Sequence, residues 1–455
     1  MRGGPLVTRP TGARPPRPRT TALLVGLGVF TAAVVGVGYL RREPERSSSR
    51  SGGYAATANR QEVERLIGAL EDEVRSAPTA DRYTQLGQLY LERARNGGDL
   101  RNYAQAEAAA HRAVDLAPSD PDARSLLAAV RYSSHDFAGA LALAEAVLAG
   151  TPSHVGALAT VGDARLELGD YDQAPAIYSR LAASNPEAPA ATIRQARLAY
   201  VQGRSDEARR LAALADDQAR ASALGGASLT LYVAYHAQVE LDTGHYADAA
   251  RLFGAALDET PASFVALAGL ARARAAQGER GGAIELYEKA VAVLPDPATL
   301  GALGDLYRLD HQEAKAATEY GTVEVTAALG EFNKQVYNRA LAVFYADHDL
   351  RVDEALRLSE AELAVRKDVF GYDAYAWALF KNGRLSDARA ASDAARGQQT
   401  QDARMLYHAG MISAALGDRE RARSELGEAL AISPQFDPLQ APRARDALAA
   451  LSARS

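Results

Sequence analysis

The sequence contains no cysteine, only five lysines and a single tryptophan. Without cysteine the chain cannot form disulfides, thiolate metal sites or a cysteine nucleophile. Other catalytic signatures are missing too, because the sequence has no His-Glu-x-x-His motif, Walker loop or Gly-x-Ser-x-Gly elbow. One candidate acid/base or metal cluster is Asp347-His348-Asp349, which we interpret as a polar turn between two helices. We therefore predict no catalytic residue, metal or cofactor, with an uncharacterised enzyme as the remote alternative.

Charge is unevenly distributed along the 455 residues. The formal net charge is −6, yet residues 1–50 contain nine Arg and two Glu. The rest of the chain is therefore acidic, which argues against nucleic-acid binding, since that requires a basic face. Arginine and alanine in such excess indicate a bacterial source with a GC-rich genome.

Only one long uncharged run is present, from Ala22 to Leu40, and it is followed directly by Arg41 and Arg42. At about 1.5 Å per residue, a helix of this length spans the hydrocarbon core of a bilayer. A cleaved signal peptide is the competing interpretation, but the run is too long and lacks a small-x-small cleavage site. We predict a single transmembrane helix over residues 21–40, hence a single-pass bacterial membrane protein.

The orientation of this helix is predicted from its flanks. The basic tail resists translocation, which favours a cytoplasmic tail and an extracytoplasmic body. The alternative is a cytoplasmic-facing regulatory or signalling adaptor. Gly28, Ala32 and Gly36 form a small-xxx-small stripe that could allow weak self-association, although such residues also simply fill apolar spans.

An alanine recurs through the remaining chain at a period near 34 residues. The positions, interrupted by an insertion after the fourth, are Ala106, Ala140, Ala174, Ala208, Ala249, Ala283, Ala316, Ala355, Ala388 and Ala422. Turn signals such as Gly169-Asp170 divide each period into two helical runs, and prolines such as Pro186 end the second run. A repeat of this length indicates stacked helical hairpins. Small residues at the crossing allow the two helices of a hairpin to approach closely.

The pattern resembles the tetratricopeptide repeat (TPR). Its residues are clearest as Tyr83, Leu86, Gly87, Tyr90, Ala106, Ala113 and Pro118 in the first unit and as Leu303, Gly304 and Tyr307 in the seventh. The resemblance implies an all-α fold, a right-handed α-solenoid of about ten hairpins. We expect irregular stacking near residues 220–228 and 330–350, where the pattern is interrupted.

The expected organisation of the chain has six parts. In order they are a disordered basic tail (1–20), the transmembrane helix (21–40), a flexible linker (41–59), a capping helix (60–78), the TPR solenoid (79–435) and a C-terminal capping helix (436–455).

Members of this family usually bind a peptide or partner helix in the concave groove lined by the first helices. The resemblance therefore implies a membrane-anchored protein-interaction scaffold. Groove positions read from the repeat are Arg194, Arg197, Tyr200, Gln238, Arg272, Asp305, Trp377 and Phe380. The first three share one helical face and could hold a carboxylate, or could belong to a solvated face with local salt bridges. Trp377 could equally be a binding anchor or part of the core between repeats.

Overall fold

The computed structural model describes residues 60–97, 100–332 and 338–453. The predicted tail, transmembrane helix and linker, with Gly28, Ala32 and Gly36, lie outside the described residues. None of the helices in the described part is both long and apolar enough to cross a membrane.

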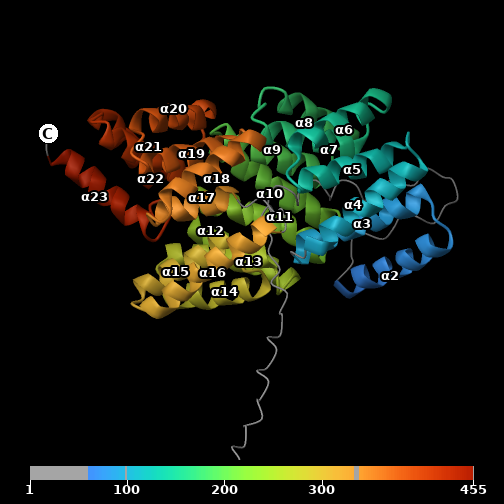
Figure 1. Ribbon diagram of the computed structural model, residues 1–455, viewed down its shortest axis with the longest axis horizontal. Helices are drawn as coiled ribbons and strands as arrows, with labels where there is room; N and C mark the ends of the chain where they lie inside the picture. Colours follow the sequence, from blue (N-terminus) through green and yellow to red (C-terminus); the bar gives the residue numbers. More distant parts are fainter. Residues whose placement is uncertain (1–59, 98–99, 333–337, 454–455) are drawn as a thin grey trace, which may run out of the picture.

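The described residues form twenty-two α-helices and contain no strand (Figure 1). Ten consecutive pairs form antiparallel hairpins, from α3–α4 to α21–α22, with α2 and α23 flanking them. The helices are α2 (Arg60–Ser76), α3 (Ala80–Gly97), α4 (Leu100–Leu116), α5 (Pro121–Ser133), α6 (Phe137–Gly150), α7 (Val155–Glu167), α8 (Ala174–Ser184), α9 (Pro189–Val201), α10 (Ser205–Ala221), α11 (Gly226–Asp242), α12 (Tyr246–Glu259), α13 (Phe264–Ala276), α14 (Arg280–Val293), α15 (Pro297–Leu309), α16 (Glu313–Phe332), α17 (Asn338–Asp347), α18 (Val352–Val365), α19 (Val369–Lys381), α20 (Leu385–Ala395), α21 (Ala403–Ala415), α22 (Arg419–Ile432) and α23 (Gln440–Ser452).

The recurring alanines occupy the crossing between the two helices of each hairpin. All ten are buried, with at most 2% of their surface exposed. In the third hairpin, a glycine of the first helix is also constrained, because a Cβ on Gly162 would lie 2.3 Å from the ring of Tyr178 on the second helix. Small residues are therefore required on both sides for close packing. Residues 222–225 link α10 to α11, and α16 and α17 flank residues 333–337, which lie outside the described part, so the irregular stacking expected near these two places stays a prediction.

The first helices of the hairpins form the inner layer of the solenoid. Helices α5, α7, α9, α11 and α13 contact one another in succession, as do α15, α17, α19 and α21. In the part of the chain described here, second helices make no comparable contacts with each other, so they diverge on the outer side. The inner surface is thus built from first helices, where the repeat predicts a binding groove.

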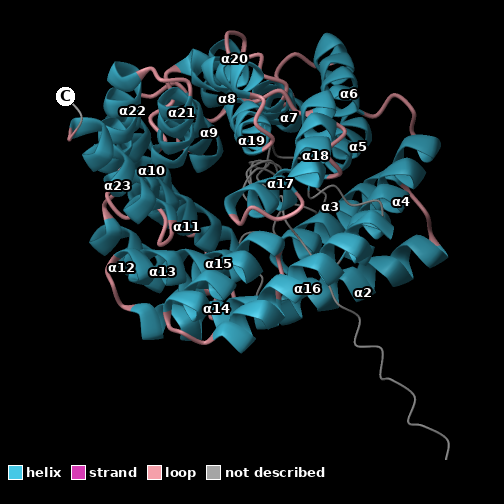
Figure 2. Cartoon of the chain, turned by 60° about the vertical axis from the view of Figure 1, so that its left-hand side comes forward, coloured by secondary structure: helices cyan, strands magenta, loops and turns pink. Residues whose placement is uncertain are grey.

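The solenoid turns back onto itself. Figures 1 and 2 both show α19 beside α9, and Val369 of α19 shares a buried cluster with Leu198 of α9. Three glycines in the turns of the third, fourth and fifth hairpins make this contact, and a Cβ on each would collide with a backbone carbonyl of the later chain. The pairs are Gly169 with Lys367, Gly203 with Gln399 and Gly244 with Ile432. We call this contact the seam.

Side chains at equivalent positions of the same hairpins reinforce the seam. Tyr171 accepts a hydrogen bond from the Val369 amide at 2.8 Å, and the Tyr246 hydroxyl accepts one from the Gln435 amide at 2.8 Å. In the hairpin between them, the Ser205 hydroxyl lies 3.1 Å from the Gln401 side chain. The seam therefore joins positions almost 200 residues apart at a regular interval.

His236, on α11, contacts an acid of α10 and makes the stability of the fold depend on pH. His236 lies 3.2 Å from a carboxylate oxygen of Asp216 and 3.7 Å from one of Glu240. Burial alone would lower the pKa of His236, but the hydrogen bonds and charges of these two acids outweigh it and raise the pKa to about 9.

We expect His236→Gln to destabilise the protein by about 1–2 kcal/mol, since each pKa unit is worth about 1.4 kcal/mol and solvent screening reduces the effect. Because the folded-state pKa exceeds the ordinary value of 6.5, this contribution is complete below pH 6.5 and disappears as pH rises through 9. Urea unfolding of both proteins between pH 6 and pH 10 measures the difference. A difference that does not change with pH would contradict the assignment.

Candidate binding surface

The predicted residues Arg194, Arg197 and Tyr200 lie on α9 and do contact carboxylates, but those of this chain. Arg194 is fully buried and its guanidinium pairs with Asp163 at 3.0 Å. The Tyr200 hydroxyl donates to Asp402 across the seam at 2.9 Å. This face of α9 is therefore occupied by structural contacts.

Arg197, the remaining predicted residue on α9, belongs to a buried ion cluster at the seam. It pairs with Glu167, whose other oxygen lies 2.9 Å from Nε of Arg366. Burial would raise the pKa of Glu167, but the charges of Arg366 and Arg197 lower it to about 2. Because Arg366 comes from the eighth hairpin and Glu167 from the third, this cluster connects two turns of the solenoid.

Gln238 and Arg272 lie beside a pocket on the inner surface. Both donate to Asp242, Gln238 at 2.7 Å and Arg272 at 2.8 Å. The pocket has a volume of about 170 Å³, and its lining comes from five first helices and the segment that precedes α23. The lining residues are Asp242, Arg272, Arg339, Val343, Phe370, Asp373, Asp402, Ala403, Arg404, Ser433 and Phe436.

Two of the three arginines that line the pocket, Arg272 and Arg404, keep more than a third of their side-chain surface exposed. The Arg272 side chain is 41% exposed and that of Arg404 is 38% exposed, although each lies among several hairpins. Arg404 reaches Asp437 only at 3.3 Å. Burial raises the pKa of Asp242 even though Arg272 lies beside it. The inner pocket thus offers accessible guanidinium groups in a partly desolvated setting.

Trp377 lies inside the packing between the ninth and tenth hairpins. Its ring is 1% exposed and stacks on His408 at a centroid distance of 4.2 Å. The half-buried Phe380 also stacks on the Trp377 ring, with a centroid distance of 4.9 Å. The Trp377 indole N–H donates to Asp347 at 2.8 Å. Of the two interpretations left open by the sequence, the structure places Trp377 in the core between repeats.

Within the Asp347-His348-Asp349 segment, His348 contacts Asp305, whereas Asp347 and Asp349 have other partners. Asp305 is 8% exposed and bonds both the Tyr320 hydroxyl and the His348 ring at 2.7 Å. Asp349, in the left-handed region at φ 54°, accepts from Lys381 at 2.6 Å. These side chains point to different partners, as expected for a turn between α17 and α18.

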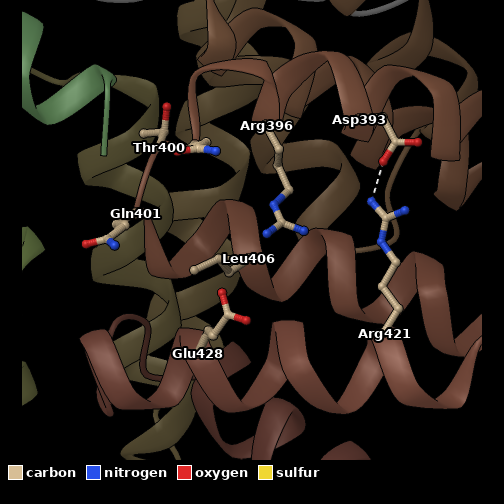
Figure 3. Close-up of a pocket in the computed structure, with 8 residues that line it drawn as sticks. Asp393, Arg396, Thr400, Gln401, Leu406, Arg421 and Glu428 are labelled. Carbon is tan, nitrogen blue, oxygen red and sulfur yellow. Dashed lines mark hydrogen bonds and ion pairs between the residues drawn. The ribbon is translucent and has the colours of Figure 1, made fainter. Parts of the chain in front are cut away.

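A second, larger pocket lies on the outer side, between α20 and α22 (Figure 3). Its volume is about 460 Å³ and its lining residues are Asp393, Arg396, Gln399, Thr400, Gln401, Leu406, Arg421 and Glu428. Neither this pocket nor the seam was predicted from the sequence. One sequence signal of the seam is a hydroxyl-bearing residue two positions after the turn glycine in three successive hairpins. These residues are Tyr171, Ser205 and Tyr246.

The described residues form an all-α repeat solenoid, and its two pockets are candidate binding surfaces. Two models of the tetratricopeptide repeat match the chain, one over residues 131–192 and 240–306 and the other over 91–155 and 374–438. Together they cover about half of the sequence. The chain belongs to the tetratricopeptide repeat family, and no enzyme family is indicated.

Several solved structures match the chain at low sequence identity. A TPR protein from Thermus thermophilus is 20% identical, covering 43% of this chain and 98% of that one, with a TM-score of 0.37. One from Parabacteroides merdae is 19% identical, covering 58% and 93%, with a TM-score of 0.38. Human IFIT1, solved as a dimer with PPP-AAAA, is 14% identical, covering 83% and 96%, with a TM-score of 0.43. No curated protein gave a significant match.

Proposed function

We propose that this protein is a membrane-anchored scaffold that binds a segment of a partner protein on the inner surface of its solenoid. The observation that carries the proposal is the inner pocket, because five first helices from distant hairpins contribute to it. A protein-interaction role agrees with the family, whose repeats serve as scaffolds for protein partners.

The chemistry of the pocket favours a polar or charged segment. Arg272 and Arg404 offer partly exposed guanidinium groups, and Phe370 and Phe436 contribute apolar walls. Arginine and aromatic side chains commonly dominate the energetics of protein interfaces. A volume near 170 Å³ accommodates one side chain or chain end, so the partner would contact the pocket with a short element.

The anchor is proposed from the sequence alone. Residues 22–40 carry no charge, and a helix of that length matches the bilayer. Alkaline phosphatase fused after residue 60 is expected to be active, with the solenoid outside the cytoplasm. An inactive phosphatase fusion together with an active cytoplasmic reporter would support the adaptor with the opposite orientation.

Crosslinking in the native membrane tests the binding surface. We expect the double variant Arg272→Ala/Arg404→Ala to capture its partner at least about tenfold less, because each charge-assisted hydrogen bond contributes about 1.5–3 kcal/mol. Arg251→Ala is the matched control, since this arginine is 67% exposed and pairs with Asp248 three residues away. Thermal melts check that the double variant is folded. Equal capture by a folded double variant would exclude the inner pocket as the binding surface.

A further inference from the structure

The outer pocket exists because the second helix of the ninth hairpin is short. Helix α20 has 11 residues whereas α22 has 14, and the 3-10 turn η1 (Arg396–Gln398) leads the chain away from it. Leu406 on α21 forms the floor between the two helices (Figure 3). The gap left by the shorter helix is therefore lined with polar residues at its rim and has an apolar base.

Three arginines converge beside this pocket on one buried glutamate. Glu425 is 1% exposed, and Arg396 and Arg421 both donate to it. The guanidinium of Arg389 lies 3.8 Å from the same carboxylate. Asp393 is the second acid, and it pairs with Arg421. Three arginines thus face these two acids on one wall, and Glu428 on the opposite wall balances the remaining charge.

Arg396 presents the cation to the pocket. Its Nη1 bonds Glu425, and Figure 3 shows its guanidinium directed into the space above Leu406. The opposite wall holds Glu428, an exposed acid whose hydrogen bond, at 2.6 Å, comes from the Ser424 hydroxyl on its own helix. Glu428 therefore opposes any anion that approaches Arg396.

The seam fixes the remaining wall. The Thr400 hydroxyl donates to the Val201 carbonyl, and Gln401 lies against Ser205 of the fourth hairpin. These contacts hold the segment from Gln399 to Gln401 at the edge of the pocket. Its two amide side chains can both donate and accept, which suits the main chain of a peptide.

We propose that the outer pocket binds an acidic side chain of a partner protein, with its carboxylate on Arg396 and the flanking peptide groups on Gln399 and Gln401. A carboxylate and a guanidinium can form two parallel hydrogen bonds, which gives the contact its geometry. The pocket is larger than a single carboxylate needs, so it also has room for the neighbouring main chain. This site is separate from the inner pocket and does not depend on the proposed function.

The test uses fluorescein-labelled, acetylated peptides of four glutamates or four glutamines and the intact protein in detergent. Fluorescence anisotropy should show binding of the glutamate peptide at least tenfold tighter than that of the glutamine peptide. We expect Arg396→Gln to lower the affinity for the glutamate peptide by about tenfold or more. We expect Glu428→Gln to raise this affinity by up to about fivefold, since it removes an exposed negative charge that repels the peptide.

Glu420→Gln is the matched control, because this exposed acid lies on the first turn of the same helix. It should leave the affinity within about twofold of the unmodified protein. Displacement of the glutamate peptide by inorganic phosphate at low millimolar concentration would identify a general anion site and overturn the proposal. Equal affinity for the glutamine and glutamate peptides would overturn it too, because the pocket would then not recognise a carboxylate. Unchanged affinity in both Arg396→Gln and Glu428→Gln would also overturn it, and the second variant leaves the arginine cluster intact.

Discussion

Glu167→Gln is expected to destabilise the protein by about 3–5 kcal/mol. The substitution leaves the guanidinium groups of Arg197 and Arg366 without their shared counter-charge, and removing one member of a buried ion pair has a cost of this size. Chemical denaturation monitored by circular dichroism measures the change. Because Arg366 lies on the other side of the seam, the midpoint should fall for the whole solenoid.

The control for this substitution is Glu354→Gln. Glu354 pairs with Arg357 three residues away, and the arginine side chain is 60% exposed, so the expected loss is below about 1 kcal/mol. The Glu167 effect should also depend on pH. Its folded-state pKa is lowered from 4.5 to about 2, so its contribution is complete above pH 4.5 and disappears as pH falls toward 2. Equal losses for the two substitutions would contradict a buried cluster.

Gly203→Ala is expected to open the seam. Gly203 has φ 69°, and a Cβ on it would lie 2.1 Å from the carbonyl oxygen of Gln399. The left-handed backbone costs an alanine about 1–2 kcal/mol, and the collision with a backbone atom adds about 1–3 kcal/mol. Besides a lower unfolding midpoint, we expect faster tryptic cleavage at Arg396 and Arg404, which flank the displaced segment.

Gly278→Ala separates the cost of the left-handed backbone from the cost of the Cβ collision. Gly278 occupies the equivalent turn of the sixth hairpin with φ 83°, but nothing lies within 4 Å of a Cβ placed there. It therefore carries the backbone strain without the collision. A loss in Gly278→Ala as large as that in Gly203→Ala, with unchanged cleavage in both, would show that the seam does not constrain Gly203.

The hairpins could be predicted from the sequence because their determinants are local. An alanine recurs at the position of Ala174 in every unit, and a turn glycine such as Gly169 lies two residues after the first helix in the third to sixth, ninth and tenth hairpins. Packing between adjacent hairpins repeats with the sequence, so one good unit predicts the next. The same reasoning located Arg197 and Arg272 on first helices, where the structure has them.

The partners of those side chains could not be predicted, because they depend on the number of hairpins in one turn of the solenoid. Tyr200 meets Asp402, which is 202 residues away, and no local pattern links the two. Small differences in stacking angle accumulate over several hairpins before this contact forms. Trp377 illustrates the same limit, because its burial requires Asp347 and His408 from the hairpins on either side.

The seam is the central feature of this account, and an engineered crosslink tests it most directly. The chain has no cysteine, so Ser205→Cys/Gln401→Cys introduces the only two thiols. These positions are 196 residues apart in sequence, and their side chains lie 3.1 Å apart. A short bis-maleimide should join them within one molecule in high yield, producing a faster-migrating band in denaturing electrophoresis, while each single variant gives none. Failure to form this intramolecular product, with both thiols shown to react with a monofunctional maleimide, would contradict a solenoid that turns back onto itself.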